Sequence, residues 1–125
     1  MKNLPPLSDR DASRLSKLVT GGHFIPIINN TKWAELIEEM LNAKEMKPQF
    51  HTRSVFAPPG FVTEWDGEWN CHIHPVAELE WVELRAASPQ WLHETLRKRN
   101  IPFSEEQGVV RVWGYTQPGA QPCWR

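Results

Sequence analysis

The chain has 125 residues, 40% of them apolar and 23% charged, and a formal net charge of −1, so it is long enough for one hydrophobic core and has the composition of a globular protein. Its two cysteines, Cys71 and Cys123, are too few for a disulfide framework. No apolar run is long enough to span a membrane and the first residues show no secretory signal, so we expect a single cytoplasmic domain over residues 1–125 with no membrane partner.

The first third of the chain predicts two helices. Ser8 can cap a short helix that stops at Gly21–Gly22, and we interpret residues 1–22 as an N-terminal helical arm. Farther along, apolar residues recur at i, i+3, i+4, i+7 and i+8 spacing. This spacing predicts an amphipathic helix over about residues 31–43, with one face in the core.

The middle third predicts antiparallel strands. Asp66–Gly67 is a two-residue turn signal, so residues on either side of it are expected to pair as a hairpin. Alternation then places Trp69 in the core and Trp65 on the outer face. A third strand over residues 78–86 follows, with Leu79 and Trp81 inward. The outer face then carries a polar and aromatic set: Phe61, Thr63, Trp65, Glu68, Asn70, His72, His74, Glu78 and Glu80. In this register Glu83 is a discordant acid on the inward face.

The last third predicts a helix followed by a second hairpin. Ser88–Pro89 is a cap followed by proline at the first helical position, and the helix should run to about residue 99. A turn at Gln107–Gly108 places Val110 and Val112 inward. Residues 117–125 are expected to be a loop tail. The resulting fold class is α+β, with a largely antiparallel sheet and helices packed on one face. The residues expected to form its core are Trp33, Leu36, Met40, Trp69, Ile73, Leu79, Trp81, Leu92, Leu96, Val110 and Val112.

Charge is unevenly distributed along the chain. Between Ser54 and Leu84 there are six acidic residues and no Lys or Arg, whereas basic residues prevail from Arg85 onward. Such asymmetry concerns partners rather than fold. We therefore interpret the acidic and aromatic outer face as a partner-binding surface, with these candidate residues: Trp65, Glu64, Glu68, His72, His74, Glu78 and Glu80.

The same cluster has a chemical alternative. His72 and His74 stand two apart on one strand, and a cross-strand carboxylate from Glu78 or Glu80 could complete a zinc site or an acid–base pair. A lone H-x-H spacing fixes no third and fourth ligand, and cross-strand His–Glu pairs explain it equally well. We therefore predict no bound metal, no cofactor and no catalytic residue.

The second hairpin offers another candidate face. Arg111, Trp113 and Tyr115 alternate outward, and an Arg–aromatic stripe on a sheet can stack the bases of single-stranded nucleic acid. The chain has a negative net charge and no basic stripe, so no nucleic-acid partner is expected.

Four segments, "NTKW", "WDGEW", "LEWVEL" and "VRVWGYT", resemble a family of small uncharacterised bacterial proteins, a domain of unknown function, over about residues 29–116. The resemblance implies bacterial origin and a stand-alone cytosolic domain, and it supplies no activity. The chain is also loosely similar to bacterial toxin-immunity proteins, which are short, α+β and locally acidic. The expected function is thus an immunity protein that occludes a cognate toxin. The alternatives are a small metal-dependent or acid–base enzyme and a housekeeping interaction domain.

Overall fold

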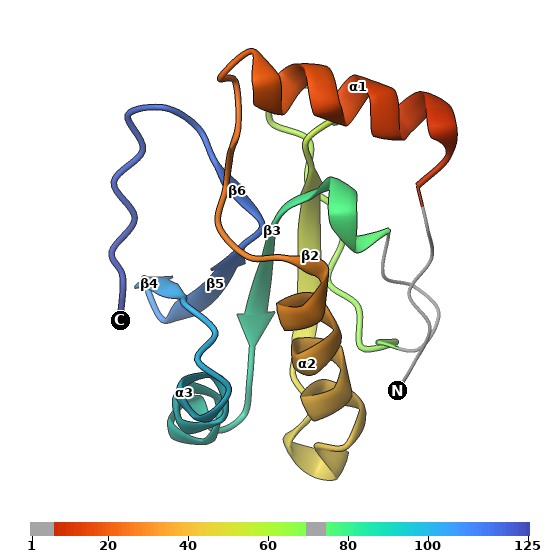
Figure 1. The fold of residues 1–125 in the computed structure, drawn as a ribbon. Coiled ribbons are helices and arrows are strands. Elements are labelled where there is room, and N and C mark those ends of the chain that lie inside the picture. Colours follow the sequence, from red (N-terminus) through yellow and green to blue (C-terminus); the bar gives the residue numbers. More distant parts are fainter. Residues whose placement is uncertain (1–6, 70–74) are drawn as a thin grey trace.

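The computed structural model describes residues 7–69 and 75–125. Within these residues the structure has three α-helices, two short 3₁₀ helices and six strands (Figure 1). In chain order they are α1 (Asp9–Thr20), β1 (Ile25–Pro26), α2 (Asn30–Leu41), η1 (Lys44–Met46), β2 (Gln49–Ser54), η2 (Val76–Glu78), β3 (Leu79–Arg85), α3 (Pro89–Lys98), β4 (Ser104–Glu106), β5 (Val109–Trp113) and β6 (Tyr115–Thr116).

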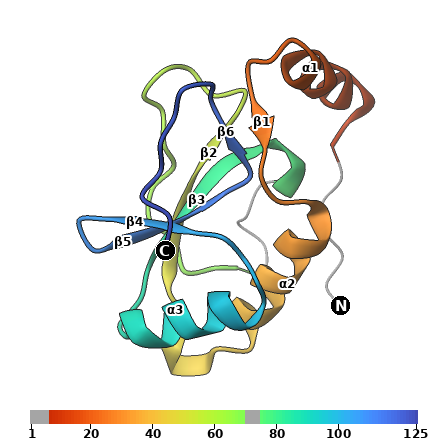
Figure 2. The same ribbon diagram turned by 60° about the vertical axis from the view of Figure 1, so that its left-hand side comes forward.

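The strands form two antiparallel sheets. The larger has the order β2-β3-β5-β4, and β1 pairs with β6 in a second, two-stranded sheet. Helices α2 and α3 pack on one face of the larger sheet, where their apolar residues join those of β3 and β5 in one cluster. Figure 2 shows the two helices together on the same side of the strands. The predicted compact α+β fold is confirmed.

The helix starts follow the cap chemistry of the sequence. Ser8 and Ser88 accept the backbone N–H of Asp11 and of Trp91, and so cap α1 and α3. Helix α2 begins after Asn29, whose side chain accepts the N–H of Lys32. Helix α1 contributes no buried residue and lies across the top of the molecule in Figure 1, apart from α2 and α3.

The core forms where the sequence patterns predict it. Every expected core residue that the structure describes is buried, namely Trp33, Leu36, Met40, Trp69, Leu79, Trp81, Leu92, Leu96, Val110 and Val112. Ile73, the remaining member of that prediction, lies outside the described residues. Trp81 is buried, but on the face of the sheet opposite α2 and α3, because its cross-strand partners are Arg53 and Trp113 rather than Thr52 and Val112.

The second hairpin has the predicted turn. Glu106 pairs with Val109, so Gln107 and Gly108 are the two turn residues. Both have positive φ, 52° and 78°, as a type I′ turn requires. Ser104 consequently lies opposite Arg111.

The two-residue hairpin turn predicted at Asp66–Gly67 was wrong, because neither residue has the positive φ that such a turn requires. Residues 61–66 lie along β2, where Phe50 and Asp66 exchange two backbone hydrogen bonds of 2.8 Å. Residues 70–74, most of the predicted partner strand, lie outside the described residues. Thr63 N–H also donates to Thr52 O at 3.0 Å. Asp66 turns the chain differently, because its Oδ1 accepts the N–H of Glu68 at 2.7 Å. Pairing with a strand more distant in the sequence overrides the local turn signal of Asp66–Gly67.

The last residues of the chain lie beside β4. Ser104 and Trp124 form an isolated bridge, Glu105 N–H donates to Cys123 O at 3.2 Å, and Arg125 N–H donates to Phe103 O at 2.9 Å. The end of the predicted loop tail thus continues the sheet beyond its fourth strand.

Candidate functional site

The sheet face opposite α2 and α3 carries a continuous stack of rings and cationic side chains. The Arg111 guanidinium lies 4.8 Å from the centre of the Trp113 ring and 4.1 Å from that of Trp81. His51 stands next to Trp81, with ring centroids 5.7 Å apart. The stack then continues through Trp65, which lies 3.9 Å from His51 in stacked geometry and has the Arg85 guanidinium 4.2 Å from its centroid. We refer to these six residues as the cation–aromatic stack.

Glu83 connects two members of this stack. Its Oε1 lies 2.5 Å from His51 Nε2, and its Oε2 accepts hydrogen bonds from Arg111 Nε at 3.1 Å and Nη2 at 2.8 Å. The sequence pattern placed Glu83 on the same face as Trp81, which the strand register confirms. Glu83 therefore lies on the sheet face opposite the helix-covered core. Its carboxylate, which looked out of place in the sequence pattern, has two partners there, His51 and Arg111.

Glu80 does not lie on the predicted outer surface. It is only 5% exposed, and its carboxylate accepts from Arg53 Nε at 3.1 Å and from Gln117 Nε2 at 3.3 Å. The prediction failed because the register between β2 and β3 shifts between Arg53 and Ser54, so that Ser54 pairs with Leu79. Such an irregularity breaks the strict alternation on which the prediction depended.

Arg53 also holds the loop that follows β2. Its Nη1 donates to Pro58 O and to Phe61 O, both at 2.9 Å, and its Nη2 donates to Ala57 O at 3.4 Å. One planar guanidinium thus fixes three carbonyls and a buried carboxylate, a geometry that only arginine provides. Phe61, at the end of this loop, is 56% exposed.

Trp65 is not a freely projecting anchor. It is half-buried, with His51 on its ring at 3.9 Å and the Arg85 guanidinium over it at 4.2 Å. Arg85 therefore places a positive charge beside residues 54–84, the part of the sequence that contains no Lys or Arg. Among the other candidates, Glu64 and Glu68 are exposed and Glu78 is half-buried. His72 and His74 lie outside the described residues.

The second candidate face divides into two parts. Arg111 and Trp113 belong to the cation–aromatic stack, and Trp113 Nε1 donates to Ser104 Oγ at 2.8 Å. Tyr115 lies in the two-stranded sheet, where its hydroxyl donates to Ala77 O at 2.9 Å. Burial raises the pKa of Tyr115 above its ordinary value of 10.0. The structure thus joins Arg111 to Trp65 through His51 and leaves Tyr115 out.

His51 and Arg53 are the residues that sequence reasoning missed. Both alternate along β2 in "QFHTRS", where the pattern indicates a strand face but not the strand that it meets. The pairing of His51 with Glu83 brings His51 into the stack. The pairing of Arg53 with Trp81 brings Arg53 next to Glu80.

A hollow of about 370 Å³ opens between β2 and the residues beside it. The described residues that line it are aromatic, hydroxyl-bearing or acidic: Phe50, Thr52, Phe61, Thr63, Glu64, Trp65 and Asp66. Phe50 and Thr52 are themselves buried. We call it the acidic–aromatic hollow. It combines the most exposed of the large apolar side chains that stand out at the described surface, Phe61, with an exposed acid, Glu64.

Metal-binding and membrane-spanning features are absent from the part of the chain that the structure describes. Within residues 7–69 and 75–125, no three or more His, Cys, Asp or Glu side chains are grouped so as to hold a metal ion. Over the same residues, no helix combines the length and the apolar character needed to cross a bilayer.

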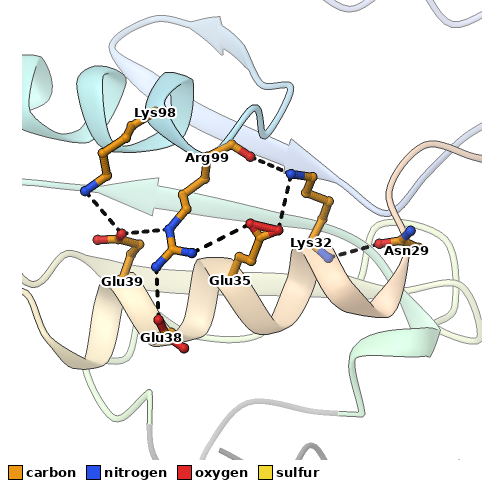
Figure 3. Close-up of polar contacts among 7 residues, drawn as sticks. All are labelled: Asn29, Lys32, Glu35, Glu38, Glu39, Lys98 and Arg99. Atoms are coloured by element: carbon orange, nitrogen blue, oxygen red, sulfur yellow. Dashed lines mark hydrogen bonds and ion pairs between the residues drawn. The ribbon is translucent and has the colours of Figure 1, made fainter. Parts of the chain in front are cut away.

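A network of ion pairs joins α2 to the end of α3 (Figure 3). Arg99 donates from Nε to Glu39 at 2.8 Å and from Nη2 to Glu38 at 3.0 Å. Lys32 Nζ donates to the Arg99 carbonyl at 2.6 Å, and Lys98 lies 3.3 Å from Glu39. The hydrogen bond from Arg99 holds the pKa of Glu39 below its ordinary value of 4.5. We assign this network to the packing of the two helices.

The fold defines a small α+β protein in which two helices cover one face of an antiparallel sheet and charged and aromatic side chains occupy the other. The chain belongs to a family of unknown function, DUF6678, whose model matches residues 15–119. The match agrees with the resemblance to an uncharacterised family noted from the sequence. No curated protein and no solved structure matches the chain.

Proposed function

We propose that the chain is a protein-binding module, and specifically an immunity protein that neutralises a toxin by covering it. The observation that carries the proposal is Phe61, which is 56% exposed and whose carbonyl is fixed by Arg53 at 2.9 Å. A large aromatic side chain on a preorganised backbone is the kind of residue that dominates binding energy at protein interfaces.

The charge around Phe61 indicates the kind of partner. Glu64 and Glu68 are exposed on the same segment. Toxins that act on nucleic acids or nucleotides often have basic clefts, and an acidic surface with an aromatic anchor complements such a cleft. Charge complementarity of this kind raises the association rate and selects the partner, while the apolar anchor slows dissociation.

A nucleic-acid partner is less well supported by the same geometry. Trp65 is in contact with His51 and Arg85, and Arg111 lies between Trp81 and Trp113. The rings of the cation–aromatic stack are therefore already engaged with one another. Stacking a base on them would require these contacts to separate, whereas a protein partner can use Phe61 with the stack intact.

The test is copurification from the native host, followed by identification of any stoichiometric partner. The variants Phe61→Ser and Glu64→Lys change exposed side chains of the proposed surface, and Ile25→Ser changes a side chain that is 46% exposed on β1. We expect the wild type and Ile25→Ser to retain the partner, and Phe61→Ser and Glu64→Lys to lose it while remaining folded.

Coexpression of the identified partner tests the specific form of the proposal. If the partner arrests growth and the wild-type chain restores it, the immunity function is supported. A harmless partner would leave the binding module and remove the immunity function. Retention of the partner by both surface variants would place the interface elsewhere, and the absence of any stoichiometric partner would overturn the proposal.

A further inference from the structure

We infer that the acidic–aromatic hollow receives a cationic side chain, arginine or lysine, from the partner. This inference rests on the proposed function and adds to it the chemistry of the partner residue. Among the described residues that line the hollow, two are acidic and none is basic. Two arginines lie beside it, because Arg85 covers the Trp65 ring and Arg53 donates to the Phe61 carbonyl. The group that attracts an entering cation is therefore the exposed carboxylate of Glu64.

The exposed ring of Phe61 favours an organic cation over a metal ion. Phe61 is in the lining and is 56% exposed, and guanidinium and ammonium groups are attracted to the faces of aromatic rings. A hard metal ion instead requires six or more oxygen ligands in a defined geometry. Glu64 supplies a carboxylate at the same place, so one arginine can contact a ring and an acid together.

The hollow has room for a side chain and is held rigidly. Its volume of about 370 Å³ lies within the range of pockets that take small molecules, ~300–1,000 Å³. Its two sides are held together by hydrogen bonds between Phe50 and Asp66 and between Thr52 and Thr63, whose Oγ1 accepts the Thr52 N–H at 2.8 Å. Little ordering is thus needed when a side chain enters.

The experiment titrates the folded protein with Nα-acetyl-arginine N-methylamide and follows backbone amide shifts by NMR. Nα-acetyl-citrulline N-methylamide, which has nearly the same shape and no charge, is the matched control. We expect the arginine probe to shift the amides of Phe61 and Thr63 and the citrulline probe to bind at least about tenfold more weakly, because the interaction depends on charge.

Two isosteric variants give the effect of a single acid. Glu64→Gln removes a carboxylate from the hollow, and Glu94→Gln removes an exposed one from α3. We expect Glu64→Gln to weaken the arginine probe about two- to fivefold, the range of an exposed charge pair, and Glu94→Gln to leave it unchanged. Equal binding of the two probes, or no shift at Phe61 and Thr63, would overturn the inference.

The outcome is separable from that of the proposed function. A partner that requires Phe61, together with an arginine probe that does not bind, leaves the binding module standing and removes the cation site. If the arginine probe binds at Phe61 and Thr63 but no cellular partner is found, the hollow recognises cations and the proposed immunity function fails.

Discussion

Arg53 and Glu80 form an ion pair, 3.1 Å from Nε to Oε1, in which the carboxylate is almost completely buried. The same guanidinium donates to the carbonyls of Pro58 and Phe61. The residue that compensates the buried acid therefore also shapes the loop that presents Phe61, so stability and the proposed binding surface depend on one side chain.

Removing Glu80 should be costly. In Glu80→Ala the Arg53 guanidinium, whose side chain is 17% exposed, loses its carboxylate partner, and breaking a buried pair costs about 3 kcal/mol. Urea unfolding should show this loss, whereas Glu64→Ala should stay within about 0.5 kcal/mol of wild type because Glu64 is exposed. Equal, small effects of both substitutions would mean that Glu80 is at the surface after all.

Trp65 should contribute mainly to stability. Trp65→Ala removes the ring that stacks on His51 and lies under Arg85, and we expect a loss of about 2 kcal/mol in the free energy of unfolding. Trp124→Ala, at a ring that is 44% exposed, should cost less than about 1 kcal/mol. Both are measured by chemical denaturation. An unchanged unfolding free energy in Trp65→Ala, combined with faster dissociation of a partner, would restore the interpretation of Trp65 as a surface anchor.

Gly114, between β5 and β6, should tolerate no side chain. A Cβ at this position would lie 2.2 Å from the Leu79 carbonyl oxygen, and neither backbone can yield easily because Gly114 N–H donates to Glu80 O and Gly114 O accepts the Ile27 N–H. We expect Gly114→Ala to lower the unfolding free energy by about 3 kcal/mol or more. Gly67→Ala is the matched control, since a Cβ there meets nothing within 4 Å. Similar thermal midpoints for the two variants would contradict this close approach.

The α2–α3 network should make stability depend on acidity. Because the pKa of Glu39 in the folded state lies below its ordinary value of 4.5, folding favours the ionised form. That contribution is present above the ordinary pKa and is lost as pH falls below 4.5 through the folded pKa. Glu39→Gln should thus destabilise the protein near neutral pH and have a smaller effect at about pH 3, measured by urea unfolding at both. A constant difference across that range would show that ionisation of Glu39 does not contribute.

The parts of the fold that local chemistry specifies could be predicted from the sequence. Helices α2 and α3 follow from the apolar spacing and, for α3, from the Ser88 cap, and the second hairpin follows from Gln107–Gly108, whose pairing is purely local. The first predicted hairpin has an equally good turn signal at Asp66–Gly67, but neither residue has positive φ, and residues 61–66 lie along β2. A local pattern gives no information on whether a distant strand offers a better partner.

The candidate site could be predicted only in part. Of the candidate acids, Glu64 and Glu68 are exposed. Glu80 is not, because its burial depends on Arg53, which is 27 residues away in the sequence. The joining of Trp65 and Arg111 through His51 likewise depends on the register of three strands, which no single stretch of sequence records.

The segments that flank the larger sheet have a consequence for solubility. Residues 61–66 lie along β2, and residues 123–125 lie along β4, so each outermost strand has backbone groups already occupied. An open strand edge is a template on which a second molecule can add its own strand, and the growth of fibrils begins in this way. In this protein the two irregular segments occupy those strand edges and oppose such growth, and no additional regular strand is needed. Detaching the last three residues would uncover β4 and leave its N–H and C=O groups available for intermolecular pairing.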